Sequence, residues 1–369
     1  MSAAVLMAWG CGHTEPFASP PYGSDAPFDP TPPQRLTYND AADRYPSWLS
    51  DGSGLLYSSQ QTTRLDADLC AALLPPTGGT QRELWCDVPS GGAETDAIES
   101  PVVGADGQLA FVGTSTTVGG LIPIRRGIAV ADTLDPASAQ MVRSFPYTPA
   151  GSTEQFTAEG VRWLDPTRVV YLGQQLAAQA LCLGCPVDTL RSGQAVTILD
   201  LGAPGSLPVA VPGTATATGV AVGPSGDALL YTLAGDSRVY RFLLASGTVQ
   251  VAHDFGAAGV VRDIQVVGSR MAAVVGGRVA VSGHPALGSV QYDSGGVVHV
   301  VDLNSGEDVA LDPADRLYRR PALSPLGDRL AVEGYPLIIT SIAPDSEDSP
   351  PIVDTTVGKS GDIYLFGAP

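Results

Sequence analysis

A unit of two apolar strands joined by a tight polar turn recurs along this sequence. It is clearest in PSWLSDGSGLLYSS (Pro46 to Ser59), where an Asp-Gly turn separates the segment carrying Trp48 from the strand Leu55–Leu56–Tyr57. Related segments begin at residues 101, 161, 219, 263 and 321, so that successive units start 44 to 60 residues apart. Similar strands with uneven spacing indicate one repeated structural unit with insertions in its loops.

Most units continue into a third strand and a short fourth strand, as in RVYRFLLASGT followed by VQVAHD. Four antiparallel strands per unit of about 40 to 60 residues are typical of β-propeller blades, whose sheets pack radially. The sequence therefore predicts an all-β fold over residues 34–369, a six-bladed β-propeller of four-stranded antiparallel blades.

The two ends of the sequence fit one gap in this arrangement. The last unit has three strands and ends at GDIYLFGAP, whereas QRLTYND (Gln34 to Asp40) precedes the first unit. We expect this N-terminal strand to pair with Asp362–Phe366 and complete the last blade, because closing the ring removes an exposed sheet edge.

The stretch QRLTYNDAADRYPSWLSDGSGLLYSS resembles the repeat of TolB-type propellers, in which a Leu-Thr strand leads to Pro-x-Trp-Ser-x-Asp-Gly and then an apolar strand. The resemblance extends over six copies from Gln34 to Phe366. It is closest at Pro46–Tyr57 and Pro321–Val332, and weakest in the fifth copy. It implies the propeller fold and no particular activity, since TolB has an additional N-terminal domain for which this sequence has no room.

Charge argues against nucleic acid as a partner. The chain of 369 residues has a formal net charge of −18, with 20 Lys and Arg against 38 Asp and Glu. Binding to phosphate groups requires a basic surface, and so does electrostatic docking on anionic lipid. The 43 glycines and 31 prolines fit many short strands joined by turns better than long helices.

The N-terminus resembles the end of a bacterial lipoprotein signal. A short apolar run from Ala3 to Trp9 precedes Gly10-Cys11, and a Pro/Ser/Asp-rich segment follows. The match departs from the usual pattern at Ala8, where leucine is typical, and at the bulky Trp9. We expect residues 1–33 to be a residual signal and tether, with Cys11 as the lipidated residue and the domain anchored in the bacterial cell envelope, in the periplasm or at the surface.

Four further cysteines, Cys70, Cys86, Cys182 and Cys185, form an even set, which in an exported chain predicts disulfides. Four cysteines allow three pairings, and proximity favours Cys70–Cys86 and Cys182–Cys185. The CLGC motif could also be a redox pair or half of a zinc site. A zinc ribbon needs a second CxxC and a thioredoxin-type site needs a βαβ setting, so a structural disulfide is the preferred interpretation.

Insertions fall mainly between the second and third strands of the units. They are Gln60–Arg82, Gly113–Arg126, Gly173–Gln194, Gly276–Gly296 and Gly334–Gly361. In a propeller this joint lies on the same face as the loops between blades, so one face is expected to be elaborated and braced by disulfides. A rigid scaffold that presents variable loops is a common binding arrangement, although surface loops also grow without a function.

Catalysis finds little support in the sequence. There is no G-x-S-x-G motif, and the four histidines (His13, His253, His284 and His299) show no spacing to a carboxylate or second histidine that a metal or general-base site needs. The alternating oxygen-bearing side chains of DLNSGED (Asp302 to Asp308) are similar to a calcium loop, but a hairpin turn is favoured. DSEDSPP (Asp345 to Pro351) is expected to be a solvated acidic loop.

Two functions remain. The favoured one is a monomeric, non-catalytic binding or scaffold protein, without cofactor, that uses the elaborated face to hold a protein, peptide or glycan of the envelope. The alternative is a metal-dependent hydrolase or lactonase with its site in the central channel. That site needs Asp, Glu, Asn or His on several innermost strands, whereas those strands are predicted to be largely Pro, Val, Ala, Trp and Gly, with Asp263 as an exception.

Overall fold

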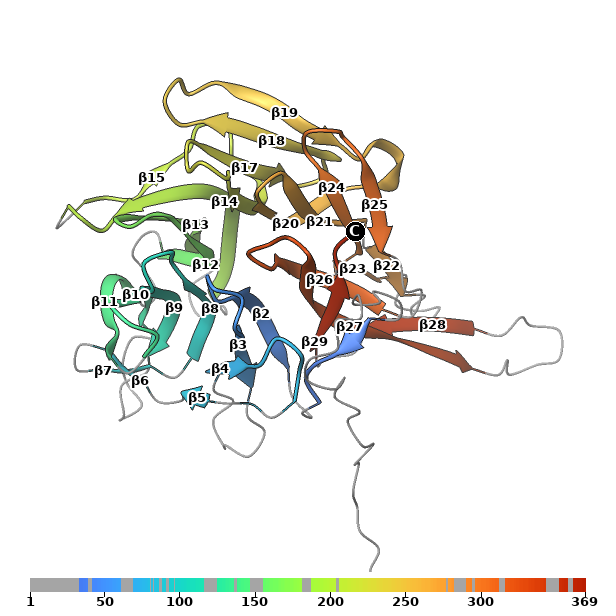
Figure 1. Cartoon of the computed structure of the whole chain (residues 1–369), viewed down its shortest axis with the longest axis horizontal. Coiled ribbons are helices and arrows are strands. Elements are labelled where there is room, and N and C mark those ends of the chain that lie inside the picture. Colours follow the sequence, from blue (N-terminus) through green and yellow to red (C-terminus); the bar gives the residue numbers. More distant parts are fainter. Residues whose placement is uncertain are drawn as a thin grey trace, which may run out of the picture.

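The computed structural model describes residues 33–38, 42–60, 69–79, 81, 83–85, 88–90, 93–95, 97–115, 125–135, 138–146, 155–180, 187–203, 206–276, 278–281, 290–293, 296–311, 316–342, 352–357 and 361–369. Within them the chain is almost entirely β, with one short 3-10 helix at Gly256–Ala258. The sheets are arranged as a propeller around a common centre (Figure 1). The predicted all-β propeller is therefore observed.

Three of the sheets have four strands in the order of the sequence, each strand antiparallel to the next. The first contains β12 (Gln155–Asp165), β13 (Arg168–Ala180), β14 (Val187–Asp200) and β15 (Val209–Ala210). The second contains β16 (Ala217–Val222), β17 (Ala228–Leu233), β18 (Arg238–Leu243) and β19 (Val249–Asp254). The third contains β20 (Val261–Val267), β21 (Arg270–Val275), β24 (Val297–Asp302) and β25 (Asp308–Leu311).

The remaining blade strands form two larger sheets. One holds β2 (Asp43–Trp48), β3 (Leu55–Gln60), β4 (Leu69–Leu74) and β5 (Glu83–Trp85) together with β8 (Ala97–Val103), β9 (Leu109–Ser115), β10 (Arg125–Ala131) and β11 (Gln140–Pro146). The other holds β26 (Arg316–Leu323), β27 (Arg329–Ile342), β29 (Asp362–Gly367) and β1 (Gln34–Arg35), with β28 (Ile352–Val357) paired to the far part of β27. Four sheets therefore stand alone, whereas the first two predicted units are joined in one eight-stranded sheet. A single parallel pair, Leu69 with Ala97, makes that connection.

Four of the six first hairpins close with the glycine turn that the repeat predicts. In the first unit Leu49 N donates to Gly54 O at 3.0 Å and Gly52 N donates to Leu49 O at 2.9 Å. The same two bonds recur around Gly107, Gly226 and Gly327. These glycines have φ between +69° and +84°, a left-handed conformation that only glycine adopts without strain. The Asp-Gly and related turns in the sequence therefore mark the hairpins correctly.

Buried apolar side chains gather between successive units rather than within one unit. The described residues contain six such clusters, and each joins two units that follow one another around the molecule. Trp48, with 7% of its surface exposed, packs with Leu36, Leu55 and Ile363, and its indole Nε1 donates to the carbonyl of Ala322 at 2.8 Å. The last unit is thus joined to the first through the Trp48 cluster.

The N-terminal strand lies where the sequence predicts it. Gln34 and Arg35 of β1 pair with Leu365 and Tyr364 of β29, and Leu36 N donates to Ile363 O at 2.7 Å. An ion pair between Arg35 and Asp362, 2.8 Å apart, fastens the same contact. Figure 1 shows this blue strand beside the red strands of the C-terminal sheet. Residues 39 and 40 of the predicted strand lie outside the described residues.

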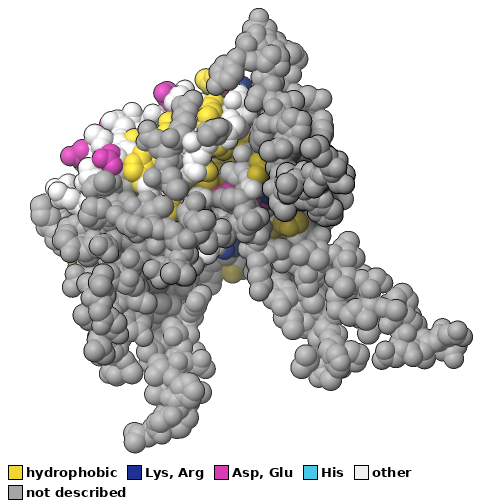
Figure 2. All heavy atoms as spheres, turned by 90° about the horizontal axis from the view of Figure 1, so that it is seen from below, with side chains coloured by type: hydrophobic (Ala, Val, Ile, Leu, Met, Phe, Trp, Pro, Cys, Tyr) yellow, Lys and Arg dark blue, Asp and Glu magenta, His cyan; other side chains and the backbone are white. Residues whose placement is uncertain are grey.

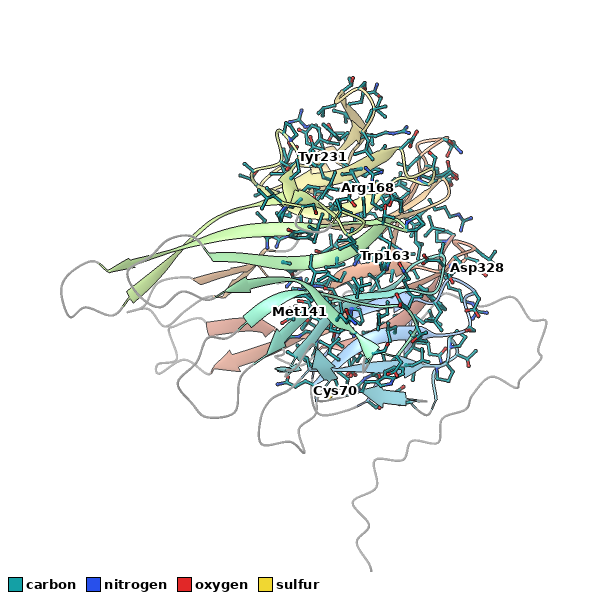
Figure 3. All side chains as sticks on the ribbon, turned by 90° about the vertical axis from the view of Figure 1, so that its left-hand side faces the viewer. Cys70, Met141, Trp163, Arg168, Tyr231 and Asp328 are labelled. Carbon is teal, nitrogen blue, oxygen red and sulfur yellow. The ribbon has the colours of Figure 1, made fainter. Side chains whose placement is uncertain are left out.

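Insertions extend the blades as β-ribbons. Strands β13 and β14 stay paired from Arg168–Asp200 out to Ala180–Val187, and β27 stays paired with β28 from Leu337–Val357 to Ile342–Ile352. Two shorter ribbons are β22 (Arg278–Val281) with β23 (Val290–Asp293), and β6 (Val88–Ser90) with β7 (Ala93–Thr95). Figure 3 shows the β13–β14 ribbon projecting from the body.

The predicted lipidation and disulfide sites lie mostly beyond the described structure. Cys11, Cys86, Cys182 and Cys185 are outside the described residues. Cys70 is fully buried on β4 and takes part in a disulfide bond. Its pairing with Cys86 stays a prediction, as does Cys182–Cys185. Among the described residues, no helix has the length and apolar character needed to cross a bilayer.

Candidate functional site

The strands that face the centre of the propeller are interrupted by β-bulges, where the register of pairing shifts. The six strands that begin the predicted units, which are β2, β8, β12, β16, β20 and β26, each contain a β-bulge. The bulges fall at Tyr45–Pro46, Ser100–Pro101, Gly160–Val161, Thr218, Arg262–Asp263 and Arg320–Pro321. A bulge leaves residues out of the ladder and re-aims their side chains. Residues of five of these bulges line the cavity described below, and those of the Ser100–Pro101 bulge do not.

Four of these bulges hold a residue with positive φ. Tyr45, Ser100 and Arg320 have φ of 57°, 52° and 46°, and Gly160 has φ of 68°. Non-glycine residues in this region are strained by about 1 kcal/mol or more. Such strain persists where surrounding contacts hold the residue, and Tyr45 and Arg320 are held by the buried ionic contacts described next.

The channel contains a cavity of about 450 Å³. Its polar lining comes from five innermost strands: Tyr45, Glu159, Arg162, Thr218, Arg262, Asp263, Arg319 and Arg320. Its apolar lining includes Pro46, Leu172, Val220, Val260, Ile264 and Pro321. Acidic and basic side chains are visible near the middle of the molecule in Figure 2, among grey atoms and apolar side chains.

Arg320 is the centre of the ionic contacts. Its Nη1 donates to both carboxylate oxygens of Glu333, at 2.8 and 3.1 Å, and its Nη2 donates to Glu159 Oε1 at 2.9 Å. The guanidinium carbon also lies 4.0 Å from the centre of the Tyr45 ring. A bidentate pair combined with a cation–π contact fixes the guanidinium in one position.

Glu333 is not among the residues that line the cavity, and it has no exposed surface. Besides Arg320 it accepts hydrogen bonds from the Tyr335 hydroxyl at 2.9 Å and from the backbone N–H of Tyr45. A buried carboxylate needs this degree of pairing, because an unpaired charge in the interior is very costly. The contact also explains how Tyr45 is held at positive φ.

The same contacts shift two pKa values. Burial alone would raise the pKa of Glu159, but the charge and hydrogen bond of Arg320, aided by Gln194, lower it to about 2. Burial raises the pKa of Tyr45 to about 12. Glu159 is therefore ionised and the Tyr45 hydroxyl is protonated at neutral pH.

The opposite wall carries a second acid and two more arginines. Asp263 accepts a hydrogen bond from the backbone N–H of Arg320 at 3.0 Å, and Arg319 Nε lies 3.7 Å from the same carboxylate oxygen. Arg262 Nε donates to the carbonyl of Gly276 at 3.1 Å. Arg162 Nη1 donates to the carbonyl of Val161 at 2.8 Å. Burial lowers the pKa of Arg162, and the negative charge of Asp263 offsets only part of that shift.

The prediction that Asp263 is an exception among apolar innermost strands is wrong. Charged residues of the segments AEGVR, VRD and YRR line the cavity because the bulges turn them toward the centre. Strand alternation read from the sequence assumes an unbroken period of two, which a bulge interrupts. The recurrent x-Pro step in YPSW, SPVV and RPAL was the available signal for these bulges.

The cavity opens on the face that carries the ribbons. Leu172 of β13 and Gln194 of β14 line it and lie at the base of the β13–β14 ribbon, and Gly276 lies directly after β21, where the β22–β23 ribbon begins. Gln194 Nε2 donates to Glu159 Oε2 at 3.1 Å, which ties the ribbon base to the ionic contacts. The pocket and the insertions therefore belong to one face.

The carboxylates of the channel do not fit a divalent metal. Glu159 and Glu333 both bind Arg320, and Asp263 faces Arg319 and the Arg320 backbone. A dication placed between them would compete with a fixed guanidinium. Among the described residues, no group of three or more His, Cys, Asp and Glu side chains could hold a metal ion.

A contact between two histidines and a carboxylate, which their spacing in the sequence does not indicate, joins two neighbouring sheets. His299 of β24 lies 2.8 Å from Asp308, and His253 of β19, on the neighbouring sheet, lies 3.9 Å from the same carboxylate. Phe255 packs edge-on against both imidazole rings. The two sheets bring these residues together at their outer edges, away from the cavity, so the cluster joins neighbouring sheets. His13 and His284 lie outside the described residues.

The segment Asp302–Asp308 forms the predicted hairpin turn. Asp302 Oδ1 accepts the backbone N–H groups of Asn304 and Ser305, at 2.8 and 3.0 Å, and Gly306 N donates to Asp302 O. The Asp302 carboxylate is thus used to stabilise the turn. The acidic loop 345–350 lies outside the described residues.

No protein-family model and no curated protein sequence matches the chain. Solved structures do match. A gluconolactonase from Xanthomonas campestris is 13% identical with a TM-score of 0.52, the match covering 91% of this chain and 88% of that one. The calcium-binding protein regucalcin from Agrobacterium tumefaciens is 11% identical with a TM-score of 0.50, covering 93% and 96%.

TolB from Acinetobacter baumannii is 15% identical with a TM-score of 0.48, and the match covers 86% of this chain but 65% of that one. The structural neighbours thus include TolB-like and gluconolactonase-type propellers. At these identities the likeness shows a shared propeller fold alone.

Proposed function

We propose that this chain is a non-catalytic binding protein that holds a partner in the central pocket, with the ribbons framing its mouth. The observation that carries the proposal is the channel chemistry: every carboxylate at the Arg320 centre is neutralised by a guanidinium, while the cavity beside it has polar and apolar walls. Pockets of this size and mixed lining are suited to binding a ligand or a chain end.

We further infer a closed ring of six blades, in which the eight-stranded sheet counts as two. Three observations support this count. The six innermost strands each carry a bulge at the corresponding place, each of these strands contacts the next, with β26 contacting β2, and six apolar clusters join successive units. The pairing of β1 with β29 would then complete the sixth blade.

The alternative, a metal-dependent lactonase, draws on structural neighbours described as a gluconolactonase and as a calcium-binding protein. Those descriptions apply to those proteins. In this chain the arginines occupy the space between the channel carboxylates, so the binding function is favoured over hydrolysis.

Metal binding and turnover separate these two functions. The purified full chain is titrated with CaCl₂ and ZnCl₂ by calorimetry, and lactone hydrolysis is followed with and without the ions. We expect no stoichiometric binding and no turnover above the buffer rate. Stoichiometric calcium binding that activates lactone hydrolysis would contradict the proposal.

The role of the ribbons is tested by shortening one. Gln174 and Gln194 pair in register, so a short turn between them removes the distal β13–β14 ribbon while keeping Leu172 and Gln194 in the pocket. We expect weaker binding of the partner with an almost unchanged thermal unfolding temperature. Unchanged binding would confine recognition to the channel.

We also propose envelope anchoring through Cys11. Mass spectrometry of the mature N-terminus, with Cys11→Ser as control, is expected to show lipid on Cys11 only in the parent chain. An unmodified, unprocessed N-terminus in a lipoprotein-competent bacterium would contradict it.

A further inference from the structure

We propose that Arg162 binds the C-terminal carboxylate of a peptide whose last residue is apolar, an inference that rests on the non-catalytic binding function proposed above. The ligand group that we expect the pocket to recognise is a planar, singly charged carboxylate next to an apolar group. Four features of the pocket lead to this inference. They are the unused hydrogen-bond donors of Arg162, the charges of the lining, its apolar residues, and the ring of Tyr45, one face of which is covered by Arg320.

Arg162 has donors to spare. It lies on β12 directly after the Gly160–Val161 bulge and lines the cavity. Its guanidinium has five N–H donors. One hydrogen bond, from Nη1 to Val161 O, is made, and no carboxylate among the described residues lies within ion-pair distance. Burial already lowers its pKa, so a bound anion would relieve an unfavourable charge.

The charge of the pocket suits a single negative charge. Among the described residues, the lining itself has four arginines against two carboxylates, Glu159 and Asp263. Glu333 and Glu99, both outside the lining, reduce this excess, since each acts on the lining residue Tyr45. The lining is therefore more basic than the chain as a whole, whose net charge is −18. A dianionic phosphate would meet Asp263 and Glu159, so a monoanion is favoured.

The geometry of the donor favours a carboxylate. A guanidinium presents parallel N–H groups that match the two oxygens of a carboxylate, which adds direction as well as energy. The apolar part of the same lining includes Val260, together with Leu172, Val220 and Ile264, which reach it from the core clusters and are each at most 5% exposed. An apolar side chain adjacent to a carboxylate fits this combination, and it is what the last residue of a peptide offers.

A sugar acid fits less well. Sugar rings pack their C–H faces on open aromatic rings, and Tyr45 is the aromatic side chain of the cavity lining. Arg320 lies over its ring at 4.0 Å and occupies that face. The remaining walls offer apolar contacts rather than a stacking platform, which favours the peptide over a uronic acid.

Calorimetric titration of the full chain tests the inference with N-acetyl-Ala-Leu and its C-terminal amide, and with methyl glucuronide and methyl glucoside. We expect the peptide carboxylate to bind at least tenfold more tightly than its amide. Arg162→Gln should remove at least tenfold in affinity, about 1.4 kcal/mol. Arg162→Lys keeps the positive charge but loses the paired N–H groups of the guanidinium. Its affinity for the peptide should lie between those of the parent chain and Arg162→Gln.

Arg168→Gln is the matched control. Arg168 is also an arginine of the β12–β13 hairpin, but it is partly exposed and pairs with Asp165 at 2.6 Å. We expect its binding to match the parent chain. Circular dichroism and thermal unfolding establish that each variant is folded.

Three outcomes would overturn the inference: equal binding of carboxylate and amide, unchanged affinity in folded Arg162→Gln, or preference for the glucuronide over the peptide. If only neutral compounds bind in the pocket, the carboxylate assignment fails while the binding function stands. If the chain instead binds calcium and hydrolyses lactones, the binding function itself fails.

Discussion

The two halves of each innermost strand differ in what determines them. The half that leads into the turn follows the repeat: Trp48, Leu164 and Leu323 are buried, and the glycine turns have one geometry. The half at the channel is bulged and charged, and its residues differ from strand to strand. The first half is built by local patterns and apolar packing, the second by ionic contacts between strands far apart in sequence.

The largest effect is expected in the packed half. Trp48→Ala removes a buried indole that packs against the last sheet and loses the hydrogen bond to Ala322. We expect a loss of about 4 kcal/mol in the free energy of unfolding, measured by urea denaturation. Leu326→Ala, on an exposed turn with 86% of the side chain accessible, should change it by less than about 0.5 kcal/mol. Similar losses in both variants would contradict the comparison.

In the channel half, Glu333→Gln keeps the shape and removes the buried charge opposite Arg320. We expect a loss of about 3 kcal/mol, because Arg320 is left with one of its two carboxylate partners. Asp227→Asn is the control: its pair with Arg241 spans 3.9 Å at the surface and should contribute less than about 1 kcal/mol. A stable Glu333→Gln variant would mean that the ionic centre does not hold the channel.

Lowering the pH should reduce the contribution of the channel contacts to the free energy of unfolding. The pKa of Glu159 is about 2 in the folded chain and near 4.5 when unperturbed. A lowered folded pKa means that its contribution to stability is fully present above about pH 4.5 and is lost as the pH falls toward 2. In the parent chain this loss should reach up to roughly 2 kcal/mol in the free energy of unfolding, and it should be absent in Glu159→Gln. Unfolding curves between pH 2.5 and 5.5 measure it, and parallel pH profiles for both proteins would contradict it.

The disulfides should stabilise the elaborated face rather than the body. Cys70 is fully buried on β4 and takes part in a disulfide bond, and Cys86 is the nearest other cysteine in the sequence. We expect Cys70–Cys86 and Cys182–Cys185 in non-reducing peptide maps, and a loss of about 2 kcal/mol in Cys70→Ser with the ring intact. Free thiols at all four positions would contradict both the pairing and the export prediction.

The smallest effects separate the two kinds of glycine. Gly52 at a turn and Gly160 at a bulge both have positive φ, and a Cβ at either would meet no close atom. Alanine should therefore cost about 1 kcal/mol at each through backbone strain alone. Gly160→Ala should in addition weaken ligand binding, since it precedes Arg162, whereas Gly52→Ala should not. If both variants bind the ligand equally well, the bulge at Gly160 does not position Arg162 for binding.

The prediction from sequence succeeded where a feature is local or periodic. The hairpin turns, the apolar strands and the pairing of the two chain ends follow from the spacing of glycine and apolar residues, and the structure has them. The blade count was read from the same spacing, but the bond between Leu69 and Ala97 joins two units in one sheet. Such a contact between the first residues of two strands in different units leaves no periodic signal in the sequence.

The sequence by itself determined the repeated hairpin, the apolar faces and the strongly acidic surface, because each depends on residues within one unit. Only the tertiary structure decided that Arg320 meets Glu159, 161 residues away, and that Asp308 meets His253 on another sheet. Arranging the sheets around a common centre brings the bulged strands together, and several bulges place charged residues in the cavity lining. The x-Pro steps give a local signal for some bulges, but no single unit encodes which bulges will face one another. The chemistry of the channel, with its arginines in an acidic chain, therefore emerges only when the sheets assemble.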